Sequence, residues 1–185
     1  MLRDFLTWLG ETPWSIGLHE SLYAWPVTES LHVLTLALFA GTAAVLDLRM
    51  LGVALKGVPV SALTNRLLPW TRVAFGLMVL TGIALFYATP LTYYHSMFFR
   101  IKMLLLAGAG VNIFIFHART LHGIAAWDSA DRPPRAARIA ATVSLTAWAG
   151  VIVCGRLVAY NWFECALNPQ SPVVRWIQSC PVTAP

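Results

Sequence analysis

Four runs of mainly apolar residues dominate this chain, and each is long enough to cross a lipid bilayer as a helix. A membrane-spanning helix needs roughly 20 such residues to cross about 30 Å of hydrocarbon. Only 11% of the 185 residues are charged, whereas a typical soluble domain carries about 25%. The sequence therefore predicts an all-α fold, a four-helix transmembrane bundle that forms one integral membrane domain over residues 1–185.

The predicted spans cover residues 29–51, 69–89, 97–117 and 138–160. Prolines lie at three of the predicted boundaries, where proline is tolerated: Pro26, Pro69 and Pro90. Aromatic and polar residues are interspersed over residues 1–28, which predicts one or two short amphipathic helices at the membrane interface. Residues 161–185 form a predicted outer tail.

The basic residues predict the orientation, because loops rich in lysine and arginine stay on the cytoplasmic side. Eight of the 13 basic residues flank the loops after the first and third spans: Arg49, Lys56, Arg66, Arg72, Arg119, Arg132, Arg135 and Arg138. We therefore expect a bacterial inner-membrane protein with both termini periplasmic. The net charge of the chain is +5. Because the basic residues flank apolar runs, we expect them to face lipid headgroups and expect no nucleic-acid partner.

Two cysteines, Cys165 and Cys180, lie in the predicted outer tail. Disulfides persist in an oxidising compartment, so the predicted periplasmic location favours a bridge between these two residues. Two unpaired thiols are the alternative. Cys154 falls inside the fourth span, where a small buried residue is the simplest interpretation.

Ionisable residues within the spans are costly, at about 2.5 to 3.5 kcal/mol each on lenient scales. One group forms an outer layer: Glu29, His32, His95, Arg100, Lys102 and Arg156. An imidazole with nearby cations suits haem b, which takes a nitrogen ligand at its iron and basic partners at its propionates. His32 is the candidate iron ligand, and Glu29, three residues earlier, is placed to orient its ring. Purely interfacial or hydrogen-bonded histidines are the alternative.

A second group forms an inner layer: Asp47, Arg49, Arg72 and His117. We expect an ion pair between Asp47 and Arg72, and an Arg49 side chain that snorkels to the membrane surface. A second redox or proton site is the other interpretation. At 1.5 Å per residue, His117 lies roughly 25 Å deeper than His32, so the two cannot share one iron. His95, Lys102 and His19 remain as possible partners of His32.

Short motifs resemble small bacterial membrane proteins. Leu31-His32, a following glycine and Asp47-Leu48-Arg49 resemble an uncharacterised four-helix bacterial inner-membrane family. More distant similarities are to the copper-resistance membrane family and to the haem-binding bacterial protoporphyrinogen oxidase. In the oxidase a histidine begins the first helix and a lysine enters a later one, as His32 and Lys102 do here, and this implies haem binding. The oxidase has a histidine where this chain has Arg100.

Two functions follow from these patterns. The first is a haem b membrane protein that exchanges electrons with a quinone or with a periplasmic or membrane redox partner, or that performs porphyrin redox chemistry. The second is a cofactor-free transporter, metal-handling or assembly protein whose polar layers are structural pairs. The sequence contains no phosphate-binding glycine loop and no paired-cysteine metal motif. Whether the protein is an enzyme stays open.

Overall fold

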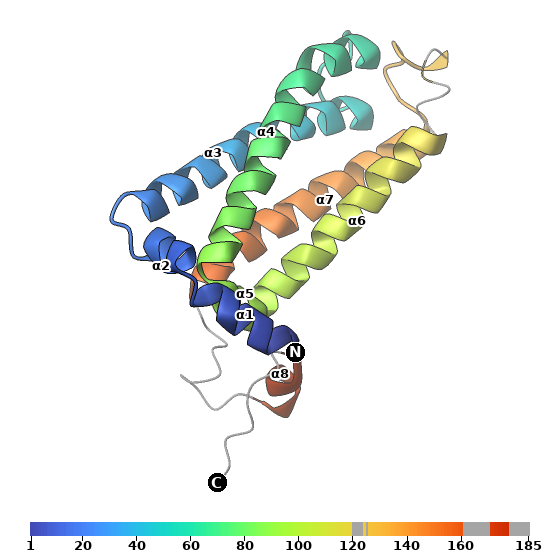
Figure 1. Ribbon diagram of the computed structural model, residues 1–185. Helices are drawn as coiled ribbons and strands as arrows, with labels where there is room; N and C mark the ends of the chain where they lie inside the picture. The colour runs from blue at the N-terminus through green and yellow to red at the C-terminus, as the bar shows by residue number, and fades with distance from the viewer. Residues whose placement is uncertain (120–123, 125, 161–170, 178–185) are drawn as a thin grey trace.

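The computed structural model describes residues 1–119, 124, 126–160 and 171–177, and the regular elements in these ranges are all helical (Figure 1). The helices are α1 (Leu2–Gly10), α2 (Pro13–His19), α3 (Ala24–Leu51), α4 (Val60–Ala88), α5 (Pro90–His95), α6 (Met97–Arg119), α7 (Arg135–Leu157), the 3-10 turn η2 (Val158–Tyr160) and α8 (Pro172–Ile177). The predicted fold class and the short helices before the first span are confirmed.

Four of these helices, α3, α4, α6 and α7, are long and apolar enough to cross a membrane. Large apolar side chains on them are exposed, among them Leu34, Leu80, Leu104 and Phe114. Such a surface is stable in lipid and not in water. The chain is therefore a multi-pass membrane protein.

The prediction that Pro69 bounds the second span is wrong, because this residue lies inside α4. With 29 residues, α4 is about 43 Å long, whereas the hydrocarbon is about 30 Å thick. Pro69 marks the start of the apolar run, and the helix continues beyond it. Water at the membrane surface can bond the main-chain carbonyl that the proline leaves unpaired.

The spans pack in the order α4, α3, α7, α6, since the main contacts join α3 to α4, α3 to α7 and α6 to α7. A small core of Phe39, Ala74 and Met78 lies where α3 meets α4, and Trp148 of α7 packs edge-on against Phe39 at 4.5 Å between ring centroids. This order leaves α3 in contact with both neighbouring helices.

One end of the bundle, which we call the terminal end, carries α1, α2 and α5 (Figure 1). The Ser15 hydroxyl donates to the carbonyls of Tyr87 and Ala88 at 2.9 and 3.1 Å. Thr12 and the Tyr87 hydroxyl lie 2.7 Å apart. The Ser15 bonds satisfy carbonyls at the end of α4 that have no partner within the helix, and together with the bond between Thr12 and Tyr87 they fix α2 against the spans.

The opposite end, the basic end, carries the loop between α3 and α4 and the segment between α6 and α7 (Figure 1). Arg49 is fully buried there, so the prediction that it snorkels to the surface is wrong. Its guanidinium donates to the carbonyls of Val58, Asp128 and Ala130 at 2.6 to 3.2 Å. One side chain of α3 therefore joins both connecting segments.

Two further contacts close the same end. The Ser61 hydroxyl and N–H donate to the Asp128 carboxylate at 2.5 and 2.7 Å, so Asp128 caps the start of α4. These bonds hold the pKa of Asp128 below its usual value. Gly52 ends α3 with φ +71°, and a Cβ there would lie 2.7 Å from the Asp131 carbonyl oxygen. Only glycine combines this backbone conformation with this close approach.

We predict that Arg49→Lys lowers the free energy of unfolding by about 1.5–3 kcal/mol, because lysine keeps the charge but cannot reach three carbonyls with one planar fork. Thermal or denaturant unfolding of the purified protein in detergent measures the change. The control is Arg66→Lys, at an exposed position of α4, which should stay within about 0.5 kcal/mol of wild type. Equal stability of all three proteins would contradict the role given to Arg49.

Candidate functional site

His32 lies on α3, half-buried against α4 within the terminal half of the bundle. Its Nδ1 is 3.1 Å from the Met78 carbonyl oxygen and 3.0 Å from the Thr81 hydroxyl. Gly82 makes this approach possible, since a Cβ at that position would lie 3.2 Å from His32 Cε1. The imidazole is therefore held by three residues of α4 that lie within little more than one helical turn.

The partners of Nδ1 define which ring nitrogen carries the proton. The Met78 carbonyl can only accept, and the Thr81 hydroxyl donates to the Leu77 carbonyl at 2.8 Å, which leaves its lone pairs for His32. Nδ1 is therefore the donor, and in the neutral ring Nε2 carries an unshared pair. No described residue hydrogen-bonds to Nε2. Histidines that bind metals have this same arrangement, with the other nitrogen donating to a carbonyl.

Lys102 of α6 lies in the same layer, close enough to His32 for their charges to interact. It is half-buried, and a Cβ at Gly155 of α7 would lie 3.6 Å from its Nζ. Cys154 is a second electrostatic neighbour. No acidic side chain in the described part of the chain pairs with Lys102. Residues of all four spans thus surround one imidazole and one unpaired cation.

The other predicted site residues lie apart from His32 or have partners of their own. Glu29 is exposed, and the acceptors of His32 Nδ1 are on α4 rather than at Glu29. The Arg156 guanidinium lies 5.0 Å from the centre of the Tyr160 ring. At the junction of α5 and α6, Arg100 donates to the Tyr94 carbonyl and His95 packs edge-on against the Tyr94 ring. Among the predicted site residues, His32 and Lys102 lie close enough for their charges to interact.

Asp47 is the polar side chain that the fold leaves least satisfied. It is 4% exposed, it interacts with Ser144 of α7, and its Oδ2 has no hydrogen-bond partner. The predicted ion pair with Arg72 is wrong, since Arg72 is exposed on α4 and no such pair forms. The two residues lie at similar depth but their side chains point to different surroundings.

The remaining predictions concern histidine, cysteine and metal. The His117 Nδ1 bonds the Ile113 carbonyl of its own helix at 2.9 Å, on an exposed face of α6. Cys154 is a buried, unpaired thiol as predicted. Cys165 and Cys180 lie outside the described residues. Among the residues that the structure does describe, no group of three or more His, Cys, Asp or Glu side chains could hold a metal ion.

Sequence reasoning missed the residues that orient His32, namely Met78, Thr81 and Gly82. A main-chain carbonyl carries no sequence signal, and a threonine in a span more often bonds its own helix. Gly82 is the available clue, because a glycine opposite an intramembrane histidine marks the point where the ring approaches the backbone.

A family model, described as a family of unknown function (DUF6644), matches residues 4–161. This match covers α1 to η2 and includes His32, Asp47 and Lys102. No curated protein and no solved structure matches the chain.

We predict that Asp47→Asn leaves the free energy of unfolding unchanged within about 0.5 kcal/mol or raises it, because the substitution removes an unpaired buried carboxylate while keeping its shape. Breaking a buried ion pair would instead cost about 3–5 kcal/mol. Melting of Asp47→Asn, Arg72→Gln and the double variant in detergent distinguishes the two cases. A large loss in both single variants with no further loss in the double variant would restore the ion pair.

Proposed function

We propose that this chain, which belongs to the DUF6644 family of unknown function, binds one haem b in the terminal half of its bundle through His32. The observation that carries the proposal is the state of the ring: Nδ1 is fixed by α4, and Nε2 has no partner in the described structure. An imidazole oriented in this way is prepared to ligate iron.

The surroundings of His32 fit the other demands of this cofactor. Lys102 offers an unpaired cation for a propionate, and a carboxylate there would offset the cost of a charge held in hydrocarbon. Gly82 and Gly155 let the ring and the ammonium group lie close to the backbones of α4 and α7. A bound haem supplies one-electron redox chemistry. His32 holds it, Lys102 anchors it, and the apolar helices exclude water.

The activity that we assign is electron transfer to or from a quinone or a periplasmic or membrane redox partner, or porphyrin redox chemistry of the kind implied by the resemblance to the haem-binding oxidase. We place the protein in a bacterial inner membrane with both termini periplasmic. The two predicted cytoplasmic segments are joined to each other by Arg49, which supports a single basic face on one side of the membrane. The site then lies toward the periplasm.

A second candidate function is that of a cofactor-free transporter, and the burial of Asp47 favours it. A buried carboxylate with one unpaired oxygen is a group that can take up a proton. One such residue without a second ionisable partner gives no path across the membrane, so we rank this function below haem binding.

The haem proposal predicts that purified protein has a Soret band and that His32→Ala lowers the haem-to-protein ratio by more than about tenfold, because the iron loses its nitrogen ligand. Added imidazole should restore binding to His32→Ala by occupying the vacated position. Lys102→Met should weaken retention and leave the ligand spectrum unchanged, since it removes only a propionate partner.

The matched control is His117→Ala, which removes a histidine from the exposed face of α6 and should retain the full band. Each variant is compared by absorbance normalised to protein, after a chromatographic check that it is folded. Wild-type protein that binds no haem, even after haemin is added, would refute the proposal. Bleaching by His117→Ala but not by His32→Ala would move the site to the basic half.

A further inference from the structure

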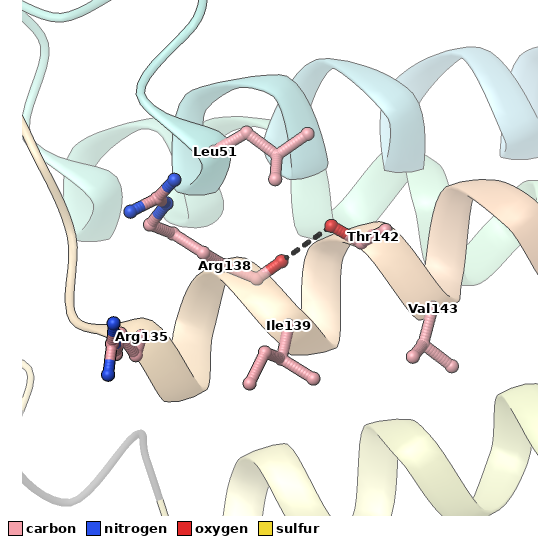
Figure 2. A pocket seen from close by; sticks show the side chains of 6 residues that line it. All are labelled: Leu51, Arg135, Arg138, Ile139, Thr142 and Val143. Atoms are coloured by element: carbon pink, nitrogen blue, oxygen red, sulfur yellow. Dashed lines mark hydrogen bonds between the residues drawn. The ribbon is translucent and has the colours of Figure 1, made fainter.

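A cavity of about 430 Å³, open to the surface, lies at the basic end between the end of α3 and the first turns of α7 (Figure 2). Its lining residues are Leu51, Arg135, Arg138, Ile139, Thr142 and Val143. This cavity is separate from His32, which lies in the terminal half of the bundle. We propose that it binds the phosphate headgroup of an anionic glycerophospholipid from the adjacent leaflet, and this binding is independent of the haem proposal.

Residue types follow a definite order along α7. Arg135 and Arg138 lie in its first turn, and Val143 lies eight residues after Arg135, which is about 12 Å along the helix axis. Charge therefore gives way to apolar surface as α7 enters the hydrocarbon. A phospholipid has this same order, since a charged phosphate is followed by acyl chains.

Both guanidinium groups are available to a ligand. Neither Arg135 nor Arg138 makes a side-chain hydrogen bond or an ion pair with a described residue. Figure 2 shows the Arg138 side chain extending toward the end of α3, beside Leu51. The Thr142 hydroxyl donates to the Arg138 carbonyl at 3.0 Å, so recognition of charge falls to the two arginines.

Two charged side chains at the connecting segments already have partners. Arg49 is committed to carbonyls and Asp128 to Ser61, so Arg49 does not take the ligand and Asp128 does not neutralise the two arginines. Arg138 can give a phosphate charge-assisted bonds, and Arg135 adds a second positive charge to the lining. Free phosphate satisfies the arginines alone, whereas a phospholipid also covers Leu51, Ile139 and Val143. The apolar residues of the lining therefore favour a phospholipid over free phosphate.

The test is native mass spectrometry of the full chain released from detergent, with phosphatidylglycerol or phosphatidylcholine of identical acyl chains as probe. We expect wild type to bind phosphatidylglycerol at least about tenfold more tightly than phosphatidylcholine. The double variant Arg135→Gln/Arg138→Gln should reduce that preference to within about twofold. Inorganic phosphate in excess should not displace the bound lipid.

The control double variant is Arg66→Gln/Arg72→Gln, which removes equal charge from exposed positions of α4 that do not line the cavity and should keep the preference. Val143→Trp fills the apolar part and should weaken binding without a change of charge. Three results would overturn the proposal: equal binding of both lipids by wild type, an equal loss in the control variant, or displacement by phosphate alone.

Discussion

The guanidinium of Arg49 is the contact on which the basic end of this bundle depends. A main-chain carbonyl that is buried away from water and has no hydrogen bond costs free energy. Arg49 is fully buried and supplies donors to three carbonyls from the two segments that connect the spans. Because α3 also packs on both α4 and α7, fixing its end fixes how the two helix pairs meet.

Because polar groups within the spans need hydrogen-bond partners, the few that have none are candidates for a function. Most hydroxyls in the spans bond their own helix, as Thr35 and Thr42 do. His32 Nε2, the Lys102 ammonium and Asp47 Oδ2 have no such partner in the described structure. His32 and Lys102 lie together, whereas Asp47 lies alone near the opposite end. A nitrogen ligand beside an unpaired cation suits the proposed haem, which is ligated through its iron and carries anionic propionates.

The apolar runs of the sequence predict the number and type of the long elements. A run that crosses lipid must form a helix, because a helix satisfies its main-chain hydrogen bonds internally. It also identifies His32, since an imidazole within such a run is costly. Partners across helices are not predictable in this way. Asp47 and Arg72 share a depth, but pairing depends on helix rotation, and Arg72 faces outward. Arg49 and Arg72 look equivalent in sequence. Arg49 is buried because the segments that connect the spans fold back onto its guanidinium, whereas Arg72 is exposed.

The central claim is that His32 carries its proton on Nδ1 and leaves Nε2 available as a ligand. Nitrogen-15 NMR of histidine-labelled protein in detergent tests it directly, with the His32 signals assigned by their loss in His32→Gln. The account predicts a protonated, pyrrole-type Nδ1 together with an Nε2 that is unprotonated or bound to iron. A protonated Nε2 with an unprotonated Nδ1 would contradict the account, because the ring would then present no lone pair to a metal.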